Sequence, residues 1–400
     1  MNNKEITQRK TKILATLGPS SNTIKKIIEL SKAGANAFRL NCSHLNEQSL
    51  RDYVRKIRRA EKILNKPIGI LVDLQGPKIR IGSVKNGENF LKKGNPFLFD
   101  LKKDIGNQKR VTLPHKKIFS SVRKGHLILL DDGKIHLKVT SVNATEIRTK
   151  VLQGGCLKSN KGVNLPQTNI KTSALSTIDK KFASIAVQEG VDWIALSFVQ
   201  KPNDIKDLRN ICSNKASIMA KIEKPSALDY IDEITNLADG IMIARGDLGV
   251  ELPIESVPGW QKKIIQVARV QGKPVVVSTQ MLESMTSSLT PTRAEVSDVA
   301  NAVFEGADAI MLSAESASGD YPIETVKMMN KIAINIEKDS NYNDILSSQI
   351  EETPDTTPDA IAIAAKTLAD ELSAPIIVCY TESGSTGIKV SRVRPSQIIL

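Results

Sequence analysis

The sequence predicts an α/β protein built on a (β/α)8 TIM barrel, with an inserted all-β domain and a partial α/β domain at the C-terminal end. Eight short apolar runs rich in β-branched residues alternate with longer segments of helical periodicity. Near-continuous apolar runs are typical of parallel strands buried on both faces. Eight strand–helix units fit a closed barrel. A doubly wound sheet would produce the same alternation, so the count alone leaves both architectures open.

The predicted elements follow one another in regular order. The eight strands are expected at residues 11–17, 35–40, 68–74, 193–198, 217–222, 240–244, 274–279 and 309–313. The helices between them are expected at residues 21–33, 48–64, 176–189, 258–271 and 290–305. Every run is shorter than the roughly 18 apolar residues that span a bilayer, so we expect no membrane partner.

One long interval interrupts this order after the third strand. Short β segments with turn signals such as Asn86-Gly87 and Asp132-Gly133 recur there. We therefore expect a separate β-barrel-like domain over residues 76–170, which divides the barrel into residues 1–75 and 171–344. A polar stretch, a helix at 360–372 and an apolar strand at 375–380 then predict a third, α/β domain over residues 345–400, which is either unusually small or truncated.

The charge and the cysteines limit the class of protein. The net charge of +13 fits either an anionic partner or a lysine-rich solvated surface, and the predicted helix at 51–62 carries much of the visible excess. We expect no nucleic-acid partner, because no basic patch is interleaved with aromatic residues. The four cysteines are far apart and form no CxxC pair, which favours reduced thiols in a cytoplasmic protein.

Polar residues follow the apolar bodies of six predicted strands. Active sites of (β/α)8 barrels lie at the C-terminal ends of the strands. A single polar residue there has an ordinary explanation, because strand ends meet solvent, but six strands converge on one face. The residues are Arg39, Asn41, Ser43, Asp73, Lys221, Glu223, Arg245, Asp247, Thr279, Gln280, Ser313 and Glu315.

Two of these carboxylates predict a divalent-metal site. Glu223 and Asp247 offer the oxygen ligands that Mg²⁺ or Mn²⁺ prefers. Lys221 projects to the same side as Glu223 under the two-residue period of a strand. It is either a structural ion-pair partner or, with Arg39 and Arg80, a clamp for phosphoryl charge. The chain has no GxxxxGK[ST] motif, which excludes a P-loop enzyme.

Longer motifs resemble the pyruvate kinase family in the expected order, and the resemblance covers essentially the whole chain. They are TKILATLGPS at 11–20, AFRLNCSH at 37–44, KIEK at 221–224, IMIARGDLGVE at 241–251, STQMLESM at 278–285 and PTRAEVSDVANAV at 291–303. The resemblance implies phosphoryl transfer from phosphoenolpyruvate to ADP, giving pyruvate and ATP in the final step of glycolysis. It also implies dependence on Mg²⁺ (or Mn²⁺), a homotetramer and a cytoplasmic location.

The resemblance implies roles for the matching catalytic residues. Glu223 and Asp247 would bind Mg²⁺ together with the substrate carboxylate. Lys221 would bridge the transferring phosphoryl group and stabilise the enolate, and Arg39 and Arg80 would neutralise phosphate charge.

It also implies residues for binding. The backbone of Ala244, Arg245 and Gly246 would meet the substrate carboxylate, and Thr279 would lie near the carbon that is protonated. The nucleotide would meet Asn41, His44 and Lys161, the last carried by the inserted domain as a lid. The monovalent-cation position matches Asn41, Ser43, Asp73 and Leu74.

One departure from the family pattern concerns that monovalent cation. Many relatives read Asp-Thr-Lys-Gly-Pro-Glu-Ile-Arg-Thr after the third strand, whereas residues 73–81 read Asp-Leu-Gln-Gly-Pro-Lys-Ile-Arg-Ile. This resembles the branch that works without K⁺. Because the ammonium of Lys78 can supply the charge that K⁺ brings beside a Glu, we expect that K⁺ is not required.

A loop near the end of the chain resembles the family's site for a sugar-phosphate effector. It offers hydroxyl and backbone N–H groups that could hold the phosphate of a sugar or nucleotide effector; an ordinary Gly/Ser turn has the same composition. Its candidate residues are Thr381, Ser383, Gly384, Ser385 and Thr386.

Two other functions remain open from the sequence. A metal-dependent aldolase acting on pyruvate-like enolates would share the metal and the enolate, but it gives no reason for the inserted domain. An inactive relative that binds nucleic acid would explain the net charge, but not the retention of Lys221, Glu223, Asp247, Arg39, Arg80 and Thr279 together.

Overall fold

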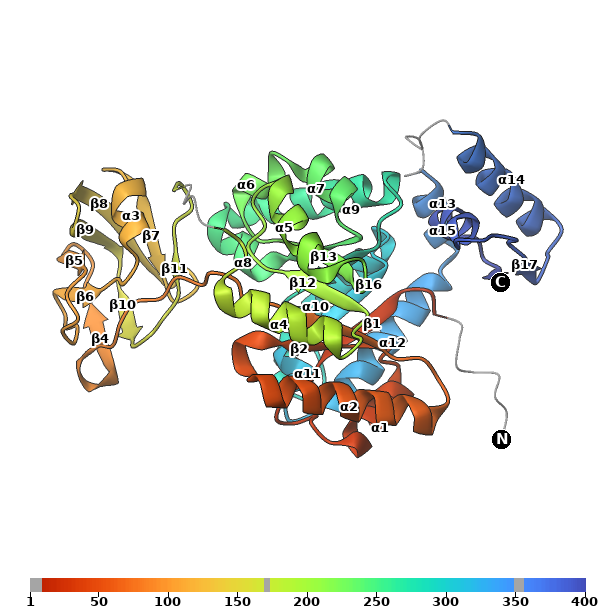
Figure 1. The fold of residues 1–400 in the computed structure, drawn as a ribbon, viewed down its shortest axis with the longest axis horizontal. Coiled ribbons are helices and arrows are strands. Elements are labelled where there is room, and N and C mark those ends of the chain that lie inside the picture. Colours follow the sequence, from red (N-terminus) through yellow and green to blue (C-terminus); the bar gives the residue numbers. More distant parts are fainter. Residues whose placement is uncertain (1–8, 169–172, 349–355) are drawn as a thin grey trace.

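The computed structural model describes residues 9–168, 173–348 and 356–400. Figure 1 shows a central barrel, with the inserted β segment on one side and the C-terminal helices on the other. The predicted domain boundary at 170/171 and residues 351–355 of the polar stretch lie outside the described residues. Within the described residues, no helix combines the length and the apolar content needed to cross a bilayer.

Eight parallel strands close the barrel in the order β1-β16-β15-β14-β13-β12-β3-β2. This closure confirms the predicted (β/α)8 architecture and excludes the doubly wound sheet, which would leave two open edges. The strands are β1 (Lys12–Thr16), β2 (Ala37–Asn41), β3 (Gly69–Asp73), β12 (Trp193–Leu196), β13 (Ser217–Ile222), β14 (Gly240–Ala244), β15 (Val275–Ser278) and β16 (Ala309–Leu312).

Helices surround this barrel, and several begin later than the sequence pattern suggested. The helix predicted from residue 21 begins after the N-cap Thr23, and the one predicted from 290 begins after Thr292, whose side chain accepts the Glu295 N–H. The helices are α1 (Ile24–Ala33), α2 (Glu47–Leu64), α4 (Thr177–Gln188), α5 (Pro202–Cys212), α6 (Pro225–Leu228), α7 (Ile231–Leu237), α8 (Arg245–Glu251), α9 (Val257–Val270), α10 (Arg293–Phe304), α11 (Ala314–Ala317), α12 (Pro322–Glu337) and α13 (Ser340–Ser348).

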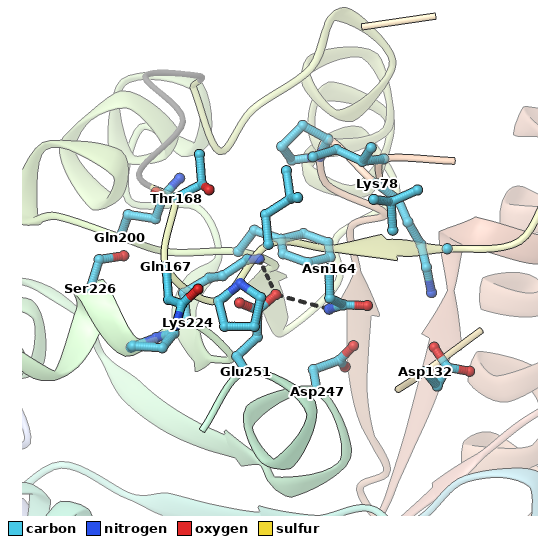
Figure 2. Close-up of a pocket in the computed structure, with 18 of the residues that line it drawn as sticks. Lys78, Asp132, Asn164, Gln167, Thr168, Gln200, Lys224, Ser226, Asp247 and Glu251 are labelled. Atoms are coloured by element: carbon cyan, nitrogen blue, oxygen red, sulfur yellow. Dashed lines mark hydrogen bonds and ion pairs between the residues drawn. The ribbon is translucent and has the colours of Figure 1, made fainter. Parts of the chain in front are cut away.

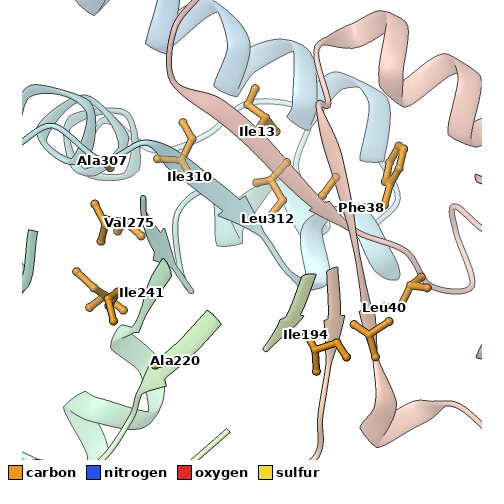
Figure 3. Close-up of a cluster of buried hydrophobic side chains, with 14 of the residues drawn as sticks. Ile13, Phe38, Leu40, Ile194, Ala220, Ile241, Val275, Ala307, Ile310 and Leu312 are labelled. Carbon is orange, nitrogen blue, oxygen red and sulfur yellow. The ribbon is translucent and has the colours of Figure 1, made fainter. Parts of the chain in front are cut away.

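The barrel strands are buried on both faces, which explains their continuous apolar runs. Alternate residues such as Ile13, Phe38 and Ile310 pack outward under the helices (Figure 3). The residues between them fill the barrel interior as a second cluster, and layers of this kind are typical of the fold. This interior layer consists of Leu14, Leu71, Ala195, Met219, Met242, Val276 and Met311, with Ala37 beside it.

The N-terminal end of the barrel strands, which we call the floor, contains the same hydrogen-bonded arrangement three times. In each copy an aspartate accepts a backbone N–H from a neighbouring strand and pairs with an arginine. Two of these arginines come from the barrel helices α2 and α5, whereas the third follows α15 (Ser385–Arg392) in the C-terminal segment. The three sets are Arg58–Asp192–Ile70, Arg209–Asp239–Ile218 and Arg394–Asp308–Val275.

Replacing Arg394 with Ala is expected to lower the free energy of unfolding by about 1–3 kcal/mol, because its guanidinium also donates to the Gly306 carbonyl. The matched control is Lys389→Ala. Lys389 is more exposed than Arg394, and its partner Asp359 also pairs with Arg392, so the loss should be less than about 1 kcal/mol. Urea unfolding of both variants measures the difference. Equal losses would show that Arg394 does not fasten the C-terminal segment to the floor.

The inserted segment has its own core and two sheets. The larger sheet has the order β11-β7-β8-β9-β5-β6, and β4 pairs with β10. A short helix, α3 (Lys116–Ser121), departs from the all-β expectation. The strands are β4 (Glu88–Leu91), β5 (Pro96–Asp100), β6 (Arg110–Thr112), β7 (Leu127–Leu130), β8 (Ile135–Val142), β9 (Glu146–Gln153), β10 (Gly155–Lys158) and β11 (Val163–Asn164).

The C-terminal segment has helices on a short parallel strand pair. It consists of α14 (Thr357–Glu371), β17 (Ile376–Ile377), α15 and β18 (Ile398–Ile399), with β17 paired to β18. The predicted strand at 375–380 was too long, because only its two isoleucines pair with β18. This α/β arrangement confirms the expected fold class of the segment.

Candidate active site

A polar layer lies directly above the apolar interior of the barrel. Along each strand, the residue two positions after the interior residue again points inward. At the C-terminal mouth these positions are Thr16, Arg39, Asp73, Ser197, Lys221, Ala244, Ser278 and Ser313. The register of the barrel strands thus places these eight residues, which are far apart in the sequence, at one level of the barrel mouth. We call them the ring.

Lys221 is the centre of this ring. Its Nζ lies 3.1 Å from Asp73 Oδ1 and 2.8 Å from Glu223 Oε1, and it donates to Ser197 Oγ at 2.8 Å. Lys221 is 8% exposed, and both acids are almost fully buried. A buried ammonium held by two carboxylates is fixed in position, since removing either partner would leave an unpaired charge.

Arg39 completes the set of charges around Asp73. Its Nε and Nη2 both lie 2.7 Å from Asp73 Oδ2, and its Nη1 donates to Thr16 Oγ1 at 3.1 Å. Asp73 Oδ1 meets Lys221. Each oxygen of the Asp73 carboxylate therefore already faces a cation.

In this ring, burial and the neighbouring charges shift the pKa values of the side chains in opposite directions. Burial alone would lower the pKa of Lys221, but Asp73 and Glu223 outweigh it and hold that pKa above its usual value. Burial alone would raise the pKa of Asp73, but Lys221 and Arg39 hold it below its usual value. Lys221 is thus a permanent cation at neutral pH.

The pKa of Glu223 is shifted upward, unlike that of Asp73. Burial raises its pKa, Lys221 opposes this rise, and the nearby charge of Asp247 adds to it. Glu223 Oε2 also accepts the Phe198 N–H at 2.9 Å. Glu223 is buried and Asp247 is half-buried, and a divalent cation bound by both carboxylates would relieve the repulsion between them.

Asp247 faces the open space above this ring. Together with Lys78 and Asp132 it lines two cavities, of about 800 and 360 Å³, between the barrel mouth and the inserted segment. Figure 2 shows the smaller cavity, with Asp247 below Asn164. Over the described ranges, its side chain has no hydrogen-bond or ion-pair partner.

The donor set of Glu223 and Asp247 fits a hard divalent cation. Both ligands are carboxylate oxygens, and Mg²⁺ commonly takes one or two carboxylates with water and substrate oxygens completing its octahedron. Among the described residues, no group of three or more His, Cys, Asp and Glu side chains is arranged to enclose a metal ion. The pair therefore suits a cation shared with substrate rather than an enclosed structural ion.

Thr279 and α8 form the neighbouring wall. The Gly246 N–H donates to Thr279 Oγ1 at 2.7 Å, and the Arg245 guanidinium donates to the Thr279 carbonyl at 2.6 Å while pairing with Asp298. Thr279 has φ +71° and Gln280 has φ +54°. A left-handed β-branched residue costs about 1–3 kcal/mol, and here it places the hydroxyl against the first turn of α8.

Some predicted site residues lie apart from this ring. Arg80 is exposed and donates to the Asn160 carbonyl, and Lys161 pairs with Asp131 at 2.7 Å within the inserted segment. Ser43 and His44 are exposed just after β2, where Asn41 Oδ1 accepts the Ser43 N–H. Leu74, of the predicted monovalent-cation position, is buried.

The candidate effector loop lies in the C-terminal segment, remote in sequence and contact from the barrel mouth. Gly384 has φ +79° and immediately precedes α15. The other candidates, Thr381, Ser383, Ser385 and Thr386, are exposed. Their hydroxyls are accessible to solvent.

Sequence reasoning missed two kinds of residue. Ser197 and Thr16 belong to the polar layer, and their place at the ends of the fourth and first predicted strands was the available signal. Glu251 was missed because its role depends on contacts between segments. Its Oε1 accepts from Asn164 Nδ2 at 2.9 Å and pairs with Lys224 Nζ (Figure 2). We call these three residues the Glu251 clasp.

The Glu251 clasp joins three functional elements. Asn164 belongs to β11 of the inserted segment, Lys224 directly follows Glu223, and Glu251 ends the helix whose first turn carries Asp247. Glu251, the shared acceptor, is 5% exposed, and its two partners are half-buried. The Glu251 clasp therefore connects the inserted segment to the two segments that carry the carboxylates of the candidate metal site.

A closed (β/α)8 barrel with cations and carboxylates at its C-terminal mouth defines a barrel enzyme that handles anions. Residues 8–326 match the family model "Pyruvate kinase, barrel domain", and residues 359–400 match "Pyruvate kinase, alpha/beta domain". The chain belongs to the pyruvate kinase family and is a phosphotransferase.

Individual relatives agree with this assignment. A pyruvate kinase of Methylorubrum extorquens is 49% identical over 98% of this chain and 82% of its own length, and one of Agrobacterium vitis is 47% identical over 98% and 83%. The crystal structure of a pyruvate kinase from Cryptosporidium parvum has a TM-score of 0.94 and 35% identity, covering 100% of this chain and 84% of that one.

Proposed function

We propose that this chain transfers the phosphoryl group of phosphoenolpyruvate to ADP, giving pyruvate and ATP, at the ring around Lys221. The observation that carries the proposal is the buried ammonium of Lys221, fixed between Asp73 and Glu223 at the C-terminal mouth of the barrel. A fixed cation in a site shielded from water stabilises charge that develops on phosphoryl and enolate oxygens.

In this proposal each residue of the site has a role that follows from its chemistry. Lys221 supplies charge to the phosphoryl group and to the enolate oxygen, and Arg39 adds charge from the neighbouring strand. The backbone of Ala244, Arg245 and Gly246 at the start of α8 receives the substrate carboxylate, which accepts the Gly246 N–H in place of Thr279 Oγ1. Thr279 lies where the enolate carbon gains its proton, directly or through water. Mg²⁺ held by Glu223 and Asp247 would supply a further Lewis-acid charge.

The inserted domain, residues 76–170, serves in this proposal as a lid that brings Arg80 and Lys161 over the nucleotide, beside Asn41 and His44. Closure is supported by the placement of Lys78 and Asp132 across the cavity from α8. Closing a lid excludes water and completes a site of this type. We further propose that residues 345–400 hold a phosphorylated effector at the 381–387 loop, and that the enzyme is a cytoplasmic homotetramer.

We also propose that the reaction needs no K⁺. Both oxygens of Asp73, at the predicted cation position, already face Arg39 or Lys221. Lys78 adds an ammonium that lines the same cavities as Asp247. A fixed side-chain charge can replace a monovalent cation whose role is electrostatic.

The test is pyruvate formation from phosphoenolpyruvate, with ADP and Mg²⁺ each omitted in turn. We expect pyruvate only when both are present, and a chelator should stop the reaction until excess Mg²⁺ is returned. Pyruvate released without ADP would contradict phosphoryl transfer and favour the aldolase-like alternative. Lack of any turnover would favour an inactive binding relative.

Replacing Glu251 with Ala is expected to raise the Mg²⁺ concentration for half-maximal rate and to lower kcat/KM by about 10–100-fold, as for other residues that orient metal ligands. The physical reason is that Lys224 and Asn164 lose their shared partner. Initial rates over a Mg²⁺ titration measure both effects. Glu255→Ala removes an exposed acid nearby and should leave both unchanged; similar losses in the two variants would rule out the clasp.

A further inference from the structure

The positive charge of this protein is concentrated in one part of the chain. Residues 76–168 carry 19 Lys and Arg against 6 Asp and Glu, a net charge of +13. The other residues carry 37 of each sign, so they are neutral together. Helix α2, which the sequence analysis took as a main source of the excess, has 6 basic and 3 acidic side chains that acids elsewhere offset. The inserted domain alone is strongly basic.

Part of this charge lies on the outer face of the larger sheet. Along β8 and β9, buried residues alternate with the outward-facing Lys138, Arg148 and Lys150. Lys138 and Lys150 are direct cross-strand partners. Like charges directly opposite one another destabilise a strand pair, and within the described part of the chain neither lysine has an ion-pair partner. The lysine pair therefore lowers the stability of the β8–β9 strand pair, and no ion pair among the described residues offsets this loss.

Much of the charge also lies away from the catalytic cavity. In Figure 1, β5, β6, β8 and β9 occupy the side of the inserted domain that is remote from the barrel, whereas β7 and β11 face it. Exposed lysine pairs follow β4 and β5 and open α3, at 92–93, 102–103 and 116–117. Exposed charges separated by more than about 8–10 Å of salt solution are largely screened. These lysines are therefore poorly placed to attract substrate into the cavity.

We propose that this basic face, defined by Lys138, Arg148 and Lys150, binds nucleic acid through its phosphate backbone. A linear polyanion matches charge that is spread over a sheet and its flanking loops. The outward positions of β8 and β9 hold no Phe, Tyr or Trp ring for stacking a base, and the imidazole of His136 lies 2.7 Å from the Gly133 carbonyl oxygen. We therefore take the binding to be independent of sequence. From the sequence we expected no nucleic-acid partner, because no basic patch is interleaved with aromatic residues. Binding through the phosphate backbone needs no such rings, and the concentration of charge in one domain supplies the cations for it.

The test measures fluorescence anisotropy of a labelled single-stranded RNA with the full chain over a series of salt concentrations. The variant K138E/K150E is compared with R55E/R59E, which reverses two exposed charges on α2. Both variants have the same net charge. The first also keeps like charges on both strands, so the stability of the strand pair is closely matched. Thermal unfolding checks that each variant folds.

We expect the sheet variant to bind RNA at least about tenfold more weakly at low salt, with a smaller slope of log affinity against log salt. The α2 variant should bind nearly as the unaltered chain does, and both should form pyruvate at the unaltered rate. Equal loss in both variants, or no salt-dependent binding by the unaltered chain, would overturn the proposal. So would tighter binding to phosphatidylserine vesicles than to RNA, which would identify a membrane surface instead.

Discussion

Replacing Lys221 with Met is expected to lower kcat for pyruvate formation by about 10³-fold or more. Loss of one group that stabilises transition-state charge typically costs 10²–10³-fold, and Lys221 serves both the phosphoryl group and the enolate in the proposed mechanism. Its Nζ lies within 3.1 Å of both acids, and among the described residues no other lysine pairs with either of them. Steady-state kinetics with phosphoenolpyruvate, ADP and Mg²⁺ measures the change.

The same substitution also removes a partner of two buried carboxylates, which commonly costs about 3–5 kcal/mol of stability. Kinetics must therefore be accompanied by thermal unfolding and by titration of phosphoenolpyruvate. A folded variant that still binds substrate but turns over slowly supports the catalytic role. A folded variant with a near-normal kcat would contradict it, and Lys221 would then be a structural ion-pair residue.

Replacing Lys78 with Glu is expected to create a requirement for K⁺. The change exchanges an ammonium for a carboxylate in cavities that Asp247 also lines. In tetramethylammonium chloride, kcat/KM should fall by about 10²-fold or more, because like charges in a partly dehydrated site repel strongly. Adding KCl should restore much of the rate by returning a cation to that place.

The matched control for this change is Lys78→Gln, which removes the charge without adding an acid. Its rate without K⁺ should fall less than that of Lys78→Glu, and KCl should restore it less fully, because no carboxylate is present to hold the ion. If Lys78→Glu works equally well with and without K⁺, the ammonium of Lys78 does not replace the ion.

The barrel was predictable because its strands obey a simple physical rule. Burial on both faces makes each strand a short apolar run, and all eight runs became strands with ends within three residues of the predicted ones. The inserted domain was harder, since α3 is a short helix among turns. The predicted strand at 375–380 was longer than the observed one, because pairing with β18, rather than composition, sets the length of the strand.

The candidate site could be predicted only in part. Residues at strand ends, such as Asp73, Lys221 and Glu223, were visible because barrel topology brings strand ends together, and the contacts among them agree with that expectation. Glu251 was not visible, since its partners Asn164 and Lys224 lie far away in sequence. The left-handed backbone conformation of Thr279 could not be foreseen either. Its positive φ accompanies packing against α8 and is not indicated by the residue type.

The central claim is that the ring around Lys221 performs phosphoryl transfer with side-chain cations and Mg²⁺ alone. The most direct measurement follows pyruvate and ATP together, from phosphoenolpyruvate, ADP and Mg²⁺, with tetramethylammonium as the only monovalent cation. We predict equal amounts of both products, with little change in kcat/KM when KCl replaces that salt. A rise of orders of magnitude with KCl, or pyruvate without ATP, would contradict the account.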